Sequence, residues 1–205
     1  MNEKNRGAEH YFAALPKSKA NLGLIHANLR GKTFKFLTAS SVFSKKRVDT
    51  GTRLLIENMI LPEKGCVLDV GCGYGAVGIA AASLNPKLRV VMTDVNRRAV
   101  LLARQNAERN RVANAKVRQG NLYAPVHDLC FSCVLSNPPV SAGMQTVEAL
   151  IRGATAVMAC NATFQMVVRS KIGRKTLPQV FTEVFENFQV LARESGYRVL
   201  MGKKQ

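Results

Sequence analysis

Residues 69–78 read Asp-Val-Gly-Cys-Gly-Tyr-Gly-Ala-Val-Gly and continue a short apolar run. Glycines at a turn from a strand into a helix let the backbone approach a ligand where any Cβ would collide. The ligand then lies at the amino end of the helix. Asp94 ends the next apolar run, where a carboxylate can accept hydrogen bonds from the hydroxyls of a ribose. The segment therefore predicts a site for a ligand that contains a nucleoside.

The glycine pattern alone leaves two classes of ligand open. Residues 73–78 satisfy G-x-G-x-x-G, and an acid about 20 residues further on completes a dinucleotide fingerprint. Asp69 favours a different ligand, because an acid on the strand can hold the loop's amides and water around a cationic amino-acid group. Its charge disfavours a pyrophosphate. On this loop alone, NAD remains a serious alternative.

A second motif, Ser136-Asn137-Pro138-Pro139, follows a later apolar run. Two consecutive prolines exclude a helix and fix φ at two positions, so the turn is rigid and the carbonyl of Pro138 has a set direction. That carbonyl and the side-chain oxygen of Asn137 are two acceptors that can hold the exocyclic amine of a base with its lone pair toward a methyl donor. Catalysis would then rest on positioning and electrostatics, without a covalent enzyme intermediate.

Residues 61–205 contain the elements that must bring these motifs together. Short apolar runs alternate with helical patterns, which predicts a parallel sheet covered on both faces. The expected strands are 66–70, 89–93, 115–118, 131–135, 164–168, 188–192 and 197–201. The expected helices are 76–84, 97–110, 146–158 and 175–185. Because parallel strands end at one edge of a sheet, the glycine loop and the Asn-Pro-Pro turn should open side by side.

Two local features refine this expectation. Asn96 should cap the helix 97–110, whose buried stripe we expect to be Val100, Leu101, Ala103 and Ala107. The last two strands are joined by Arg193-Glu194-Ser195-Gly196, which reads as a hairpin connection. A terminal hairpin, in place of further βα units, argues against a dinucleotide-binding sheet. We therefore predict a doubly wound, Rossmann-like α/β fold with a seven-stranded mixed sheet whose last strand is antiparallel.

The first 60 residues differ from the rest in their strand pattern and in their basic composition. Runs at 22–29 and 33–38 meet at Arg30-Gly31-Lys32, which predicts a β-hairpin, and a helical pattern covers about 50–60. Of the first 53 residues, 11 are Lys or Arg and three are Asp or Glu. Pro62-Glu63-Lys64-Gly65 marks a turn. We predict a basic hairpin and helix extension over 1–60 and a catalytic domain over 61–205.

The overall charge points to a polyanionic partner. The chain has 30 Lys and Arg against 13 Asp and Glu, a formal charge of +17, and neutralised phosphates release condensed counterions. A general solubility charge is the alternative. With the hairpin, the run Lys45-Lys46-Arg47 is the candidate RNA-docking surface.

Several classes of protein are disfavoured. No apolar run is long enough for a membrane helix, and the amino terminus leads into no apolar signal core, so we expect a cytoplasmic protein without membrane contact. Cys130 and Cys133 form a lone CxxC without clustered histidines, so we expect no metal site. His10, His26 and His127 are scattered and are expected to be non-catalytic. A monomer is favoured over an oligomer.

Taken together, the chain resembles the class I methyltransferases of the small methyltransferase domain family, and within them the catalytic halves of the bacterial ribosomal RNA guanine-N2 methyltransferases of the C type. The resemblance rests on Asp69-Val-Gly-Cys-Gly-Tyr-Gly, Asp94-Val95-Asn96 and Asn137-Pro138-Pro139. His10-Tyr11-Phe12, Val42-Phe43-Ser44, residues 48–55 and the closing residues 195–200 also resemble that family, so the likeness covers nearly the whole chain.

The resemblance implies S-adenosylmethionine as cofactor and ribosomal RNA, or a ribosomal particle, as partner. Residues implied at the methionine end of the cofactor are Asp69, Gly71, Cys72, Gly73 and Gly75. Asp94 would take the ribose, Val95 the adenine face, and Asn121 with Leu122 the adenine amino edge. Asn137, Pro138 and Pro139 would form the catalytic turn, with Asn137 also beside the cofactor.

The sequence departs from the family at several positions. Val140 stands where an aromatic residue is common, Met144 where a basic one is, and Asn121 where many relatives have an acid. The reaction we expect is methyl transfer to an exocyclic base amine, with guanine N2 of ribosomal RNA favoured. Methylation of a protein glutamine or of a small molecule stays open, as does an RNA-binding protein of this fold with weak activity.

Overall fold

The computed structural model describes residues 21–39, 42, 47–138 and 143–205. Its centre is a seven-stranded sheet in the order β5-β4-β3-β6-β7-β9-β8. The strands are β3 (Gly65–Val70), β4 (Leu88–Asp94), β5 (Ala115–Gln119), β6 (Phe131–Ser136), β7 (Met158–Arg169), β8 (Gln189–Glu194) and β9 (Tyr197–Lys203). The last strand, β9, lies between β7 and β8 and is antiparallel to both. The predicted fold class is confirmed.

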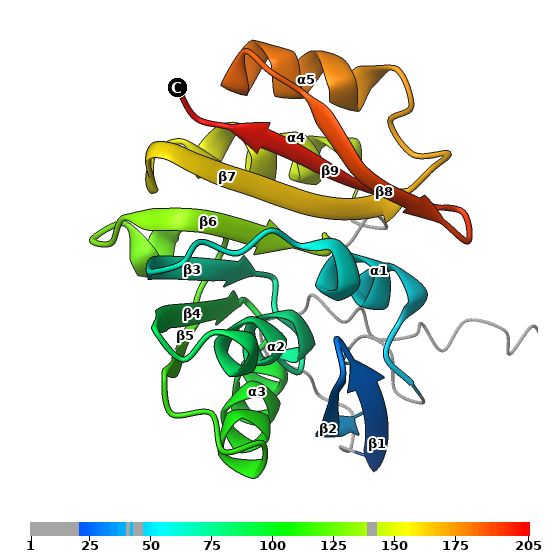
Figure 1. Ribbon diagram of the computed structural model, residues 1–205, viewed down its shortest axis with the longest axis vertical. Helices are drawn as coiled ribbons and strands as arrows, with labels where there is room; N and C mark the ends of the chain where they lie inside the picture. The colour runs from blue at the N-terminus through cyan, green and yellow to red at the C-terminus, as the bar shows by residue number, and fades with distance from the viewer. Residues whose placement is uncertain (1–20, 40–41, 43–46, 139–142) are drawn as a thin grey trace, which may run out of the picture.

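Helices cover both faces of the sheet, as a parallel core requires. On one face lie α1 (Thr50–Asn58), α2 (Ala76–Leu84) and α3 (Arg97–Arg109), and on the other α4 (Met144–Ala154) and α5 (Thr176–Phe185). A short 3₁₀ turn, η1 (Ala124–Val126), follows β5. Figure 1 shows the sheet between these two layers. Each face has its own buried apolar cluster, which packs its helices against the sheet.

Two details of the helices differ from the predictions. Asn96 caps α3 as expected, accepting from the backbone N–H groups of Arg98 and Ala99, but Leu101 is 49% exposed while Leu102 is buried. The buried residues of α3 are 99, 100, 102, 103, 106 and 107, so the prediction is confirmed for Val100, Ala103 and Ala107 and wrong for Leu101. The helix expected to reach Met158 ends at Ala154, because Val157 turns and accepts a hydrogen bond from the Phe131 amide. Met158 then begins β7.

The amino-terminal hairpin forms a two-stranded sheet of its own. It consists of β1 (Leu22–Leu29) and β2 (Lys32–Ala39), which lie beside α1 and α3 (Figure 1). The side chain of Asn106 on α3 accepts from Leu37 N at 2.7 Å and donates to Leu37 O at 2.9 Å. Asn110 makes the same pair of bonds to Lys35. The division into parts 1–60 and 61–205 stays a prediction.

A buried glutamine of β7 fixes the connection between α1 and β3. Gln165 is fully buried; its Oε1 accepts from Ile60 N at 2.9 Å and its Nε2 donates to Ile60 O at 2.7 Å. This pair of bonds holds α1 against the sheet. No helix among the described residues is long and apolar enough to cross a membrane.

Candidate functional site

Three neighbouring strands end at the same level of the sheet. Val70 pairs with Thr93 on one side and with Ser136 on the other. The residues that follow these three, namely Gly71, Asp94 and Asn137, are therefore brought into one row at the carboxyl edge. The glycine loop and the described start of the Asn-Pro-Pro motif, Asn137 and Pro138, thus lie at the same cavity, as the strand pattern predicted.

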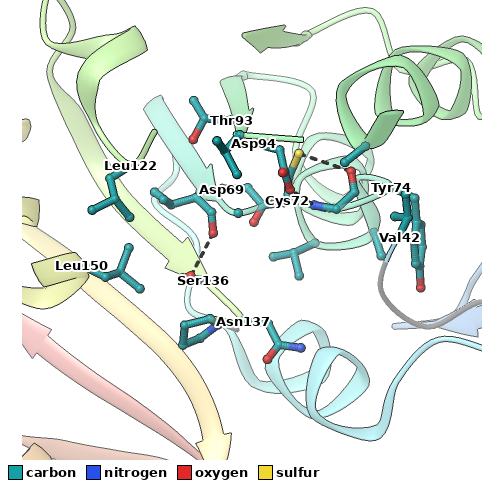
Figure 2. Close-up of a pocket in the computed structure, with 18 of the residues that line it drawn as sticks. Val42, Asp69, Cys72, Tyr74, Thr93, Asp94, Leu122, Ser136, Asn137 and Leu150 are labelled. Carbon is teal, nitrogen blue, oxygen red and sulfur yellow. Dashed lines mark hydrogen bonds between the residues drawn. The ribbon is translucent and has the colours of Figure 1, made fainter. Parts of the chain in front are cut away.

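A cavity of about 750 Å³ occupies this edge. Figure 2 shows it with Asp69 and Asp94 on one side and Asn137 on the other. Most of the lining is apolar, including Leu122 and Leu150, which is the usual make-up of a small-molecule site. The lining residues are Val42, Thr52, Asp69, Val70, Gly71, Cys72, Gly73, Tyr74, Ala76, Val77, Thr93, Asp94, Val95, Ala99, Gly120, Asn121, Leu122, Ser136, Asn137, Pro138, Thr146 and Leu150.

The glycine loop has the backbone that its sequence predicts. Gly71 and Gly73 have φ values of +70° and +58°, in the left-handed region that glycine adopts without strain. A Cβ built on either would meet no atom within 4 Å. The loop is held from beneath, because the amides of Gly71 and Cys72 both donate to the carbonyl of Thr93, at 2.8 and 2.9 Å. Its cavity side is therefore left open for a ligand.

Asp69 is a buried carboxylate in the wall of the cavity. It is 1% exposed, and its Oδ2 accepts a hydrogen bond of 2.8 Å from the amide of Gly78 in α2. Burial raises the pKa of Asp69 to about 7; the bond from Gly78 opposes this shift and the charge of Asp94 adds to it. A cationic ligand beside this buried carboxyl group would stabilise its charged form and lower its pKa again.

Asp94 binds the backbone on both sides of its own loop. Its Oδ2 accepts from Gly73 N at 2.8 Å and its Oδ1 from Asn96 N at 2.8 Å. Burial raises its pKa, while the backbone hydrogen bonds, that from Asn96 foremost, lower it. A carboxylate offers about four lone-pair sites and Asp94 lines the cavity, so it can also accept from a hydroxyl group there. Burial raises the pKa of the neighbouring Cys72 thiol, and Asp94 and Asp69 add to the effect, so this thiol stays protonated.

Asn137 has a fixed side chain. Its Nδ2 donates to Oγ1 of Thr52 at 2.8 Å and lies 3.4 Å from Oδ2 of Asp49. Asp49 is the N-cap of α1, and the same Oδ2 accepts from Thr52 N. Both partners on α1 accept from this nitrogen, so the amide nitrogen of Asn137 faces α1. The amide oxygen of Asn137 is thereby left for the cavity.

The structure brings most of the candidate residues together. The described candidates that line the cavity are Asp69, Gly71, Cys72, Gly73, Asp94, Val95, Asn121, Leu122, Asn137 and Pro138. Among the described residues predicted to bind the cofactor or to form the catalytic turn, Gly75 alone is not a lining residue. It is the N-cap of α2 at φ +92°, and a Cβ there would lie 3.2 Å from that of Ala103, so it packs α2 against α3. Pro139 and Val140 lie outside the described residues.

Several lining residues were not among the sequence candidates. Thr52 and Ser136 are the polar ones nearest the Asn-Pro-Pro turn; Ser136 donates to the carbonyl of Val70 at 2.8 Å (Figure 2) and ties β6 to β3. Asp49 could have been found as the N-cap of a helix, since Asp is a preferred residue at that position, and Thr52 then lies in the first turn. No local signal links that cap to Asn137.

The other candidates lie away from the cavity. His127 follows η1, with its Nδ1 2.9 Å from the carbonyl of Ala124, and His26 is on β1. Cys133 is buried in β6, where burial raises its pKa to about 12, whereas Cys130 is exposed. His10, Lys45 and Lys46 lie outside the described residues.

Known proteins resemble the chain in both sequence and structure. It is 37% identical to the uncharacterized protein YbxB of Bacillus subtilis (strain 168), over 96% of this chain and 99% of that protein. It is 34% identical to ribosomal RNA small subunit methyltransferase C of Shigella flexneri serotype 5b (strain 8401), over 79% of this chain and 47% of that protein. The chain thus spans about half the length of this second relative.

The fold matches a solved structure closely. The structure is the T. thermophilus 16S rRNA N2 methyltransferase RsmC in complex with AdoMet and guanosine. The TM-score is 0.81 at 25% identity, over 93% of this chain and 52% of that one. The sequence profile of the methyltransferase small domain matches residues 33–201. The chain belongs to the methyltransferase small domain family.

Proposed function

We propose that the chain transfers a methyl group from S-adenosylmethionine to an exocyclic amine of a base, with guanine N2 of ribosomal RNA as the acceptor. Membership of the family establishes the chain as a methyltransferase by sequence and fold. The observation that carries the finer proposal is the convergence of Asp69, Asp94 and Asn137 on one cavity.

The residues of the cavity fit the proposed cofactor. S-adenosylmethionine, when bound, supplies an electrophilic methyl group on a cationic sulfonium centre and carries a second cation on its amino-acid end. Asp69 would stabilise this positive charge from the wall of the cavity, and Gly71 and Gly73 leave room for close approach. The carboxylate of Asp94 is suited to accept from the ribose hydroxyls. Val95 and Leu122 offer apolar surface to the adenine.

The Asn-Pro-Pro turn suits an amine acceptor. The first acceptor is Oδ1 of Asn137, whose side-chain nitrogen is bound to Thr52. The second acceptor is the carbonyl of Pro138. Two acceptors orient an amino group by its two N–H bonds, so that its lone pair can point at the methyl carbon. Such positioning is worth several orders of magnitude in rate. Pro139 completes the proposed turn.

The choice of RNA rests on the charge and on the relatives. A formal charge of +17 suits a polyanionic substrate. The relatives named above include a ribosomal RNA methyltransferase and a structure that holds guanosine together with AdoMet. A cytoplasmic location is part of the same proposal.

Two measurements test the proposal. Calorimetry with S-adenosylmethionine and with NAD should detect binding of the first alone; tight NAD binding without the sulfonium ligand would overturn the cofactor assignment. Transfer of tritium from labelled cofactor into protein-free ribosomal RNA, followed by nucleoside analysis, should yield N2-methylguanosine. Label found only in protein, or only in a small molecule, would overturn the acceptor.

A matched pair of variants ties activity to the turn. Asn137→Ala should lose at least about a hundredfold in kcat, because it removes an acceptor used in the transition state, while binding cofactor as before. Asn161→Ala serves as the control, since Asn161 is exposed on β7 and should leave kcat unchanged.

A further inference from the structure

Exposed basic side chains gather at the carboxyl ends of β7 and β8, which lie on either side of β9. We call this group the basic rim; its members are Arg169, Lys171, Arg174, Lys175 and Arg193, all exposed. Residues 169–182 contain no acid, and the ion pairs found within the described residues involve no member of the rim. One acid, Glu194, lies next to Arg193 at the end of β8. The rim is thus a locally uncompensated positive surface.

A buried arginine holds the rim in shape. Arg198 is 5% exposed, and its Nη2 donates to the carbonyls of Ile172 and Gly173, both at 3.1 Å. These bonds fix the loop before α5 that carries most of the rim. Burial lowers the pKa of Arg198, and the charges of Arg193 and Arg174 lower it further. The positive side chains of the rim therefore repel one another, and a bound anion would reduce this repulsion.

The rim adjoins the candidate site from two directions. The ring of Tyr197 packs against α1, since a Cβ on Gly51 would lie 2.9 Å from it, and the guanidinium of Arg169 lies 5.7 Å from the same ring. Gly51 precedes Thr52, which binds Asn137. On the other side, a Cβ on Gly173 would lie 3.2 Å from Cε of Met144, the first residue of α4, whose Thr146 and Leu150 line the cavity. Figure 1 shows the loop before α5 and the β8–β9 turn at the end of the sheet toward which β3 and β6 point.

We propose that the basic rim binds phosphate groups of the RNA strand that carries the target nucleotide. The inference rests on the proposed function, because the rim lies beside the turn assigned to the acceptor amine. Arginine binds phosphate through paired N–H donors, and lysine as a point charge. Contacts of this kind fix the register of a nucleic acid without reading its sequence. The rim thus supplies affinity and orientation, whereas Asn137 and Pro138 act on the base.

The test removes three charges of the rim and compares them with three elsewhere. The rim variant is Lys171→Gln, Arg174→Gln and Arg193→Gln. The control variant is Lys64→Gln, Lys87→Gln and Arg89→Gln, which are exposed at the opposite, amino edge of β3 and β4. Both variants lose the same charge. The probe is a fluorescein-labelled RNA hairpin of mixed sequence, and its affinity is measured by anisotropy over a range of salt concentrations.

The rim variant should bind the probe about tenfold more weakly or worse, and the slope of log K against log salt should fall by about two, since each lost phosphate contact lowers it by roughly 0.7–0.9. The KM for ribosomal RNA should rise similarly at unchanged kcat. The control variant should keep the wild-type slope, and calorimetric binding of S-adenosylmethionine should be equal in all three proteins, which shows that they are folded.

Three results would overturn the proposal. The first is equal RNA binding by the rim variant and the wild type; the second is an equal loss in the control variant, which would indicate a diffuse charge effect. The third is competition by polyglutamate as effective as that by RNA, which would indicate an acidic protein partner. If the wild type methylates RNA and the rim variant does so with unchanged KM, the assignment of the rim as a phosphate-binding surface is wrong, whereas the proposed function stands. If the wild type methylates no RNA, the proposed function itself fails.

Discussion

The side-chain amide of Asn137 donates to Oγ1 of Thr52 at 2.8 Å, which joins the end of β6 to the first turn of α1. The carboxylate of Asp49 caps the same turn and lies 3.4 Å from the same nitrogen. A residue assigned to the acceptor amine is therefore oriented by a helix cap from another part of the chain. Rotation of the Asn137 amide would place a donor, instead of an acceptor, toward the cavity.

Thr52→Val tests this orientation, because valine keeps the shape of threonine and removes the hydroxyl. We expect kcat to fall about tenfold, which corresponds to the loss of one hydrogen bond of about 1.4 kcal/mol. The dissociation constant of the cofactor should change by less than about threefold. Single-turnover methyl transfer together with calorimetry separates the two quantities.

Thr52→Ser is the matched rescue, since it restores the hydroxyl within the same cap. It should recover most of kcat. If Thr52→Val and Thr52→Ser were equally slow, the effect would come from packing against α1 and the assigned orientation of Asn137 would be wrong.

Asp69 predicts a pH dependence of cofactor binding. Its pKa in the free protein is raised from 3.8 to about 7, so below pH 7 it is largely protonated and must lose a proton to face a cation. Affinity for S-adenosylmethionine should therefore rise by up to about tenfold between pH 6 and pH 8. Calorimetry in buffers of different ionisation enthalpy should detect proton release at pH 6.

The same shift has a consequence for stability, with the opposite sign. An acid that binds protons more tightly in the folded state than in the unfolded state lowers stability as pH rises between about 4 and 7, by at most about 1.4 kcal/mol per pH unit. Asp69→Asn should remove this contribution and flatten the binding profile. An identical pH profile of affinity in the variant and the wild type would rule Asp69 out as its source, and leave Asp94, whose pKa is also raised.

Much of this site follows from local sequence patterns. The strands before Gly71, Asp94 and Asn137 were predictable from their apolar runs, and parallel strands must end at one edge. The bond between Thr52 and Asn137 joins residues 85 positions apart, so no local pattern contains it. The length of β7 was underestimated because residues 158–163 alternate buried and exposed positions irregularly. The exposure of Leu101 depends on the helix phase, which a single apolar stretch leaves undetermined.

The anchoring of the hairpin yields a stability prediction. Asn106→Leu leaves the amide and the carbonyl of Leu37, and the carbonyl of Tyr74, without their side-chain partner. These groups are buried or partly buried, so the free energy of unfolding should fall by about 3 kcal/mol or more. Urea denaturation measures this loss, and hydrogen exchange at the amide of Leu37 should become faster.

Asn110→Leu is the control for Asn106→Leu, because Asn110, the C-cap of α3, makes the same pair of bonds to Lys35. That contact is exposed, so water replaces the lost bonds and the cost should stay within about 1 kcal/mol. Equal losses in the two variants would show that burial does not decide the strength of this anchor.

Two glycines of matching geometry separate the strain of a turn from its role in binding. Gly71 in the loop and Gly31 in the hairpin turn have φ values of +70° and +74°, and a Cβ on either would meet no atom within 4 Å. Alanine at either position should therefore lower the free energy of unfolding by the same amount, roughly 1–2 kcal/mol, because of the left-handed backbone. Gly71 lines the cavity and Gly31 does not.

Gly71→Ala should weaken S-adenosylmethionine binding at least about tenfold, and Gly31→Ala should leave it unchanged. Calorimetry measures the binding, and urea denaturation measures the stability of both variants. Equal affinity in the two variants would mean that the ligand does not approach the loop at Gly71.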